Sequence, residues 1–236
     1  MKSKMKKIVL IPGGITAALV LAAVVFVLTF DINSYKPRIE AAASKSTGMK
    51  VRINGKMKLS FFPSAGISIE DILIQNNGAD VASAKKAELE IRLLPLLRRE
   101  MLIKQVRLDT PSFFITKDKS GRFNLERAEK KLAPTGPFEM GKIFIKGGRA
   151  LYLDEKSGGK VEAKNCDLSI KDLSSEVGDF ISTLSFYGYL SCGEVTAQEL
   201  RISDVRVDMK ARGGKFEAAP FTMKIFGGNC RGRSRG

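Results

Sequence analysis

A run of 23 residues without a charged side chain, Ile8–Phe30, constrains this chain more than any other feature. As a helix rising about 1.5 Å per residue, it would extend roughly 34 Å, enough to cross the hydrocarbon core of a bilayer. A cleaved signal peptide is the alternative, but its apolar region normally ends after about 7–15 residues. The run therefore predicts an uncleaved transmembrane helix over residues 8–30.

The charges on either side of this run predict its orientation. Residues 1–7 contain four lysines, and Asp31 follows the run. By the positive-inside rule the basic segment 1–7 stays in the cytoplasm and everything after Phe30 lies across the membrane. Ile32, Tyr35 and Ile39 recur at helical spacing, which predicts a juxtamembrane helix over residues 31–48. This helix either continues along the membrane or leads into the first strand.

Composition limits the chemistry that the chain can perform. The formal net charge is +15, and the sequence contains no histidine and no tryptophan. Without histidine, Ser-His or Cys-His catalysis and imidazole metal sites are excluded. A basic surface suits anionic lipid or nucleic acid, and the predicted anchor favours membrane lipid as partner over nucleic acid. No phosphate loop, zinc-ligand spacing or nucleophile elbow occurs, so we expect no cofactor, no metal and no enzymatic activity.

The three cysteines, Cys166, Cys192 and Cys230, lack the C-x-x-C spacing of metal or redox sites. They are most simply interpreted as isolated small apolar residues. A Cys166–Cys192 disulfide in an oxidising compartment stays open as an alternative.

From Met49 onward the apolar period changes to two, which indicates β-strands. Odd positions from Met49 to Phe61 are apolar apart from Gly55, and the even positions are mostly basic. A hairpin at Asn54-Gly55 would pair Ile53 with Lys56 and mix lysines into the apolar face, so we predict one long strand instead. The apolar row then slips by one residue at Glu70-Asp71, which predicts a β-bulge.

Further short alternating segments continue to the end of the chain, separated by glycine and proline signals such as Gly147-Gly148. They predict antiparallel strands joined by turns. The segment Glu126–Leu132 predicts the one later helix. Residues 229–236 show no apolar alternation and predict an irregular basic tail, as in a truncated chain.

Four blocks of the sequence resemble the AsmA family in their order behind the predicted anchor. They are Asp31-Ile-Asn-Ser-Tyr-Lys-Pro-Arg-Ile39 with Gly48–Gly55, Phe61-Phe-Pro63 and Gly66–Ile72; Leu108-Asp-Thr-Pro-Ser-Phe113 with Gly121-Arg-Phe-Asn124; Ile145–Asp154; and Phe221–Gly228. The resemblance implies an inner-membrane, single-pass protein with a periplasmic β domain over residues 49–228, which takes part in outer-membrane biogenesis. The implied fold is mainly β, an elongated curved antiparallel sheet that forms a groove.

This resemblance also implies a function, the transfer of phospholipid along the groove. The predicted lining residues are Val51, Ile53, Met57, Leu59, Phe61, Ile67, Ile69, Leu89 and Ile91. The predicted headgroup contacts are Lys50, Arg52, Lys56 and Lys58. Two alternatives stay open: the apolar face packs on an ordinary core, or the chain is a non-enzymatic scaffold that aids assembly of outer-membrane proteins and contacts other envelope proteins.

Overall fold

The computed structural model describes residues 31–60, 65–92, 103–126, 138–176 and 180–235. The chain divides into two compact units, Met1–Tyr35 and Lys36–Gly236. The first contains the short 3₁₀-helix η1 (Ile32–Tyr35). The second contains the helices α2 (Lys36–Thr47) and α4 (Phe180–Thr183) and one large sheet. The predicted helix over residues 31–48 is thus present as η1 and α2.

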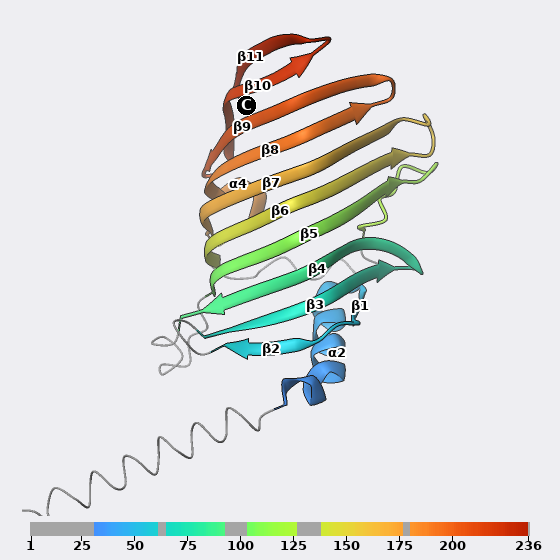
Figure 1. The fold of residues 1–236 in the computed structure, drawn as a ribbon, viewed down its shortest axis with the longest axis vertical. Coiled ribbons are helices and arrows are strands. Elements are labelled where there is room, and N and C mark those ends of the chain that lie inside the picture. The colour runs from blue at the N-terminus through green and yellow to red at the C-terminus, as the bar shows by residue number, and fades with distance from the viewer. Residues whose placement is uncertain (1–30, 61–64, 93–102, 127–137, 177–179, 236) are drawn as a thin grey trace, which may run out of the picture. The chain divides into compact units, whose positions relative to one another are not determined.

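Within the described residues the sheet has eleven strands, and most of them are long (Figure 1). Their bounds are β1 (Lys50–Ile53), β2 (Met57–Ser60), β3 (Ala65–Asn76), β4 (Ala79–Ile91), β5 (Ile103–Lys117), β6 (Phe138–Asp154), β7 (Lys160–Ser175), β8 (Ser185–Ala197), β9 (Leu200–Arg212), β10 (Lys215–Ile225) and β11 (Gly228–Arg235).

From β3 to β11 each strand pairs with the next one in the sequence, while β1 and β2 both pair with β3. All pairs are antiparallel except β5 and β6, which run parallel, from Ile103 beside Met140 to Lys117 beside Asp154. The prediction of a wholly antiparallel sheet is therefore wrong at this one pair. Residues 118–137 connect the two strands, and a connection of this length can return the chain to the starting end.

The segment from residue 50 to 60 forms no hairpin, as predicted, but it is two strands rather than one. Both β1 and β2 run antiparallel to β3 on the same side of it. The break lies between them, where the Asn54 amide donates to the Asp71 carbonyl at 2.8 Å and the Gly55 amide donates to the Glu70 carbonyl at 3.1 Å. The irregularity predicted at Glu70-Asp71 is confirmed against β1 and β2, because the register changes by one residue between the pairs Ile53–Ile72 and Met57–Ile69. Asp71 there has a left-handed backbone with φ of 53°.

Similar left-handed residues recur in the middle of other strands. We call the positions Asp71, Thr110, Gly147, Asn165 and Asp204, on β3, β5, β6, β7 and β9, the slip line. At each one the apolar alternation shifts by one residue, as a β-bulge requires. The intervening strands β4 and β8 skip one position opposite Asp71 and Asn165 and keep register. The shift keeps the apolar residues of both halves of each strand on one face.

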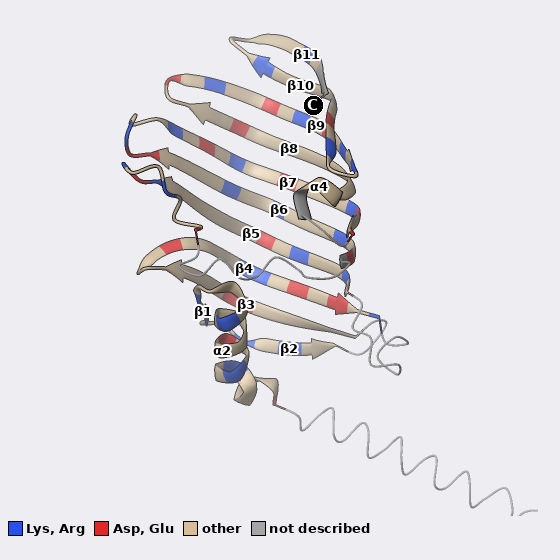
Figure 2. Cartoon of the chain, turned by 180° about the vertical axis from the view of Figure 1, so that it is seen from behind, with Lys and Arg blue, Asp and Glu red and all other residues tan. Residues whose placement is uncertain are grey.

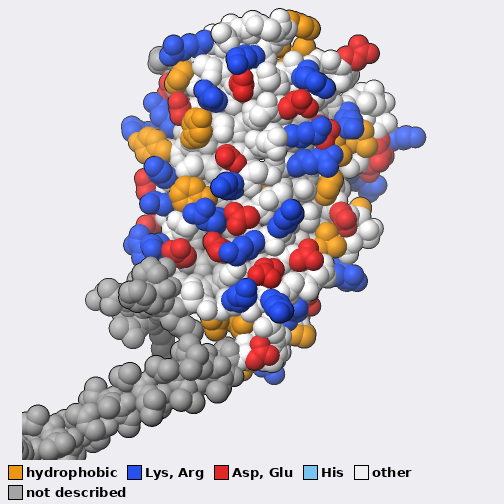
Figure 3. Space-filling model, in the orientation of Figure 1, with side chains coloured by type: hydrophobic (Ala, Val, Ile, Leu, Met, Phe, Trp, Pro, Cys, Tyr) orange, Lys and Arg blue, Asp and Glu red, His pale blue; other side chains and the backbone are white. Residues whose placement is uncertain are grey.

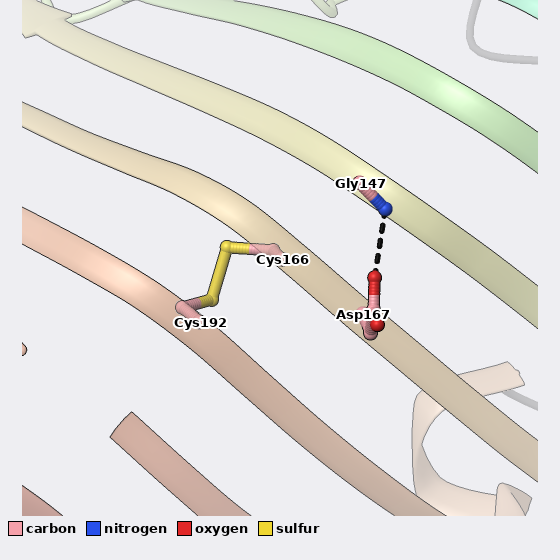
Figure 4. The surroundings of a disulfide bond; sticks show 4 residues. All are labelled: Gly147, Cys166, Asp167 and Cys192. Carbon is pink, nitrogen blue, oxygen red and sulfur yellow. Dashed lines mark hydrogen bonds between the residues drawn. A yellow bond between two sulfur atoms is a disulfide. The ribbon is translucent and has the colours of Figure 1, made fainter. Parts of the chain in front are cut away.

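The turn predicted at Gly147-Gly148 is in fact part of this slip line, because both residues lie inside β6. The break beside Thr110 likewise lies inside the continuous strand β5, where Pro111 follows it. The amide of Gly147 has left the regular ladder and donates instead to the Asp167 carboxylate of β7, 2.7 Å away (Figure 4). The apolar alternation does break at these positions, but each break is a local irregularity within a continuous strand rather than a turn.

Helix α2 lies against the edge strand β1. The Ile53 amide donates to Glu40 Oε1 at 2.5 Å, and the Val51 amide donates to Ser44 Oγ at 2.9 Å. Lys36 Nζ donates to the Gly55 carbonyl at 2.7 Å. These bonds satisfy strand-edge groups that would otherwise be available to another chain.

The predicted irregular tail is a strand. Residues Gly228–Arg235 form β11 and pair antiparallel with β10, so that Cys230 lies opposite Met223 and Gly232 opposite Phe221. A Cβ at position 232 would meet the Phe221 ring, so glycine suits this place. Backbone pairing needs no apolar alternation of its own, which is why the sequence pattern missed this strand.

Several predicted elements fall outside the described residues: the transmembrane helix over 8–30, Phe61 and nearly all of the helix Glu126–Leu132. Within the ranges that the structure describes, no helix has both the length and the apolar character needed to cross a bilayer.

Candidate functional site

One face of the sheet carries apolar side chains from β2 to β10, and we call it the apolar face. Its rows can be followed through the pairing register of neighbouring strands, because directly paired residues point to the same side. One row, on the side of the slip line where β3, β5, β6 and β8 begin, consists of Leu59, Ile67, Leu89, Val106, Ile143, Ile170, Gly188 and Met209. One row on its other side consists of Ile74, Ala82, Phe113, Ala150, Ala163, Val195 and Ile202.

The apolar face is only partly shielded from solvent. Of the apolar side chains that the structure describes, the buried ones include Val51, Ile53 and Met57 near α2 and Cys192 and Ala211 farther along. The larger members of the two rows are half-buried. Within the described residues, α2 contacts β1 and the single-turn helix α4 contacts β7, and no second layer of strands or helices covers the centre of the face (Figure 2). An ordinary core would place most of these side chains below a tenth exposed.

The predicted lining residues all lie on this face where the structure describes them. Leu59, Ile67, Ile69, Leu89 and Ile91 are half-buried. Val51, Ile53 and Met57 have only 9%, 5% and 2% of their surface exposed, next to the α2 contact. The accessible part of the apolar face therefore lies farther along the sheet than the sequence indicated, from β3 to β10.

The predicted headgroup contacts Lys50, Arg52, Lys56 and Lys58 are all exposed. Lys50 and Arg52 alternate with the buried side chains of β1 and belong to the opposite face, as does Lys58 on β2. Lys58 Nζ forms an ion pair with Glu70 at 3.2 Å. The structure thus places Lys50, Arg52 and Lys58 on the other side of the sheet from the apolar residues, while Lys56 lies between β1 and β2.

The opposite face, which we call the charged face, carries ion pairs between neighbouring strands (Figure 3). Glu162 on β7 contacts both Arg149 and Lys164, and Lys164 also reaches Glu194 on β8 at 3.7 Å. The hydrogen bond from Arg149 lowers the pKa of Glu162 below its usual value. Such exposed pairs add little stability, but they make this face compatible with water. The two faces of the single sheet therefore differ sharply in polarity.

A disulfide joins Cys166 on β7 to Cys192 on β8, whose Cα atoms are 4.1 Å apart as direct cross-strand partners (Figure 4). The Cys166–Cys192 disulfide, which the sequence left open as an alternative, is therefore present. The simpler interpretation of isolated apolar residues is wrong for these two cysteines. Both cysteines belong to the apolar face and adjoin the slip line at Asn165. The bridge closes a loop with a sequence separation of 26 residues, which stabilises a fold by about 3 kcal/mol.

Polar groups gather at one end of β3 and β5, around a shallow pocket of about 550 Å³. Asn124 holds the loop after β5 by accepting the Thr116 amide at 2.9 Å and donating to the Phe114 carbonyl at 2.7 Å. Asp118 accepts bonds from the Ser120 hydroxyl and the Arg122 amide, which lower its pKa to about 2. These contacts account for the Gly121-Arg-Phe-Asn124 block as a loop-fixing motif. In the described ranges no group of acidic or cysteine side chains has the arrangement of a metal site.

Comparison with known proteins identifies the family of this chain. The model of the AsmA family matches residues 1–183, which is well over half of the chain. No curated protein matches the sequence. The matched region includes strands β1 to β7 of the sheet together with the segment that precedes them. This chain belongs to the AsmA family.

Proposed function

We propose that this chain is a non-enzymatic protein of the bacterial envelope, anchored in the inner membrane through residues 8–30, and that its apolar face binds the acyl chains of phospholipid in the periplasm. Membership of the AsmA family supports a role in envelope or outer-membrane biogenesis or in lipid transport. The observation that carries the finer proposal is the half-exposed apolar face, which continues across the sheet from β2 to β10.

The physical argument rests on what such a face gains from a lipid. Each methylene group that leaves water for an apolar surface contributes about 0.8 kcal/mol. A monomeric protein rarely leaves a large contiguous apolar surface exposed to water, and such a surface generally marks a binding site. The charged face meanwhile keeps the same strands soluble through its ion pairs. One sheet can thus hold an acyl chain on one side and face water on the other.

The disulfide also supports a periplasmic location. Disulfides persist in oxidising compartments, and the bacterial periplasm is one of them. The Cys166–Cys192 bridge lies beyond the predicted anchor, on the side that the four N-terminal lysines assign to the periplasm.

Mass spectrometry of the full chain, extracted from membranes with a mild detergent and washed, tests this proposal. The wild-type chain should retain phospholipid. Leu168→Asp puts a charge on the apolar face and should abolish retention, because a charge without a partner is costly in an apolar site. Ser169→Asp, the next residue on the charged face, is the matched control and should retain lipid. A folded wild-type chain without bound lipid would instead favour the non-enzymatic scaffold.

A further inference from the structure

Exposed aromatic rings gather with cations at one end of the sheet, where β6, β8 and β10 begin and β7 and β9 end. Tyr187, Tyr189 and Phe216 have 47%, 41% and 42% of their surface exposed. We call these three rings, with the cations Lys142, Lys171 and Arg212, the aromatic rim. Figure 3 shows hydrophobic side chains among lysines and arginines on this side of the charged face.

The rings of the rim lie on both faces of the sheet. Tyr187 is paired with Lys171 and Lys210 on the charged face, and Tyr189 follows on the same side. Phe216 is paired with Ala211 on the apolar face, and its ring packs against Phe186 with centroids 6.2 Å apart. A flat protein partner would contact one face only. Aromatic rings on both faces of one edge are suited to a layer that surrounds that edge.

The cations of the rim include a like-charge pair. Lys142 on β6 lies directly opposite Lys171 on β7, and both are exposed. Like charges in direct cross-strand positions are unfavourable. Among the described residues, neither lysine has an acidic side chain within ion-pair distance, whereas Lys210 nearby is paired with Glu217 at 2.7 Å. An anion from outside the chain would relieve this repulsion.

The third cation is fixed beside an aromatic ring. Arg212 Nη2 donates to the Tyr187 hydroxyl at 2.6 Å, and its guanidinium lies 5.8 Å from the ring centroid. The following turn is tied to the start of β8, since the Gly214 amide donates to the Leu184 carbonyl at 3.0 Å. Tyrosine combined with lysine or arginine is typical of the headgroup level of membranes, where rings need one apolar and one wet side.

We infer that the aromatic rim docks on the headgroup layer of an anionic phospholipid bilayer. The rings enter the interface from both faces of the sheet, and Lys142, Lys171 and Arg212 bind lipid phosphates. This contact would set one end of the strands against a membrane. It does not depend on whether the apolar face carries lipid, because Tyr187 and Tyr189 lie on the charged face.

The absence of tryptophan from the chain allows a direct test. Tyr189→Trp introduces one fluorophore into the rim, and the full chain is reconstituted in vesicles of phosphatidylethanolamine and phosphatidylglycerol with brominated acyl chains as quenchers. Leu153→Trp is the matched control, because Leu153 is similarly exposed, at 36%, on the charged face at the other end of β6. We expect several-fold stronger quenching at residue 189 than at residue 153.

Charge dependence completes the test. Lys142→Gln with Lys171→Gln, added to Tyr189→Trp, should reduce the quenching to the level of the control, and so should vesicles of phosphatidylcholine alone. Circular dichroism checks that each variant keeps its sheet, and Tyr187→Trp serves as a second reporter. Equal quenching at residues 189 and 153, or quenching unchanged by the loss of anionic lipid, would overturn the inference. Absence of quenching at both residues 189 and 153, as expected for lipid held only on the apolar face, would also count against docking of the aromatic rim.

Discussion

At the scale of single residues, the slip line shows how this sheet keeps one apolar face along strands that contain breaks in their alternation. Left-handed backbone is unfavourable for most L-residues, although Asp and Asn tolerate it through local hydrogen bonds. Asp71, Asn165 and Asp204 fit that preference. Thr110 does not, because a β-branched residue with a φ of 48° is an outlier.

This strain at Thr110 leads to a prediction about stability. Thr110→Gly should raise the free energy of unfolding by about 0.5–1 kcal/mol. Glycine has no steric penalty in the left-handed region, and this gain exceeds the extra backbone entropy that glycine loses on folding. Thr116→Gly in the regular part of the same strand is the control and should lower stability by about 1 kcal/mol. Chemical denaturation measures both. Equal losses for the two variants would mean that position 110 carries no backbone strain.

At the scale of elements, α2 closes one edge of the sheet. Edge strands with free amides invite pairing with other chains, and proteins commonly cover them. The cover here is specific, because side chains of the helix accept the outward amides of Val51 and Ile53. The same contact accounts for the burial of Val51 and Ile53 and keeps that part of the apolar face from solvent.

Removing these acceptors should expose the edge. Glu40→Ala should lower the free energy of unfolding by about 1–3 kcal/mol, because it leaves the half-buried Ile53 amide without a partner. Ser44→Ala should act in the same direction at Val51. Ser46→Ala, an exposed serine of the same helix, should stay within about 0.5 kcal/mol of wild type. Denaturation curves give the energies, and light scattering should show added self-association only for Glu40→Ala and Ser44→Ala. A monomeric, fully stable Glu40→Ala would show that the helix does not protect this edge.

At the scale of the whole molecule, the sequence predicted what depends on local alternation. The odd row of residues 51–59, the absence of a hairpin at Asn54-Gly55 and the bulge at Asp71 follow from side chains that alternate along one strand. The family assignment also followed from short blocks in order, and it is confirmed by the match over residues 1–183.

The missed features depend on pairing between distant segments. A bulge at Gly147 and a true turn have the same local sequence, and only the neighbouring strand with Asp167 distinguishes them. The parallel register of β5 with β6 and the pairing of Cys166 with Cys192 are likewise set by the order of strands in the sheet. For the candidate site, alternation identified the correct face, but the α2 contact decided which part of it stays accessible.

Lipid capture from the accessible part of the apolar face tests the central claim most directly. A photo-crosslinking residue at Leu190, half-buried on the apolar face, should capture phospholipid in intact cells, and one at Ser191 should capture far less, because adjacent strand residues point to opposite faces. At Ile53, which is 5% exposed next to α2, capture should be mainly of protein. Lipid adducts at Leu190 with few at Ser191 are the result that we predict. Adducts to protein alone at Leu190, from a chain that is folded and membrane-bound, would contradict a lipid-binding face.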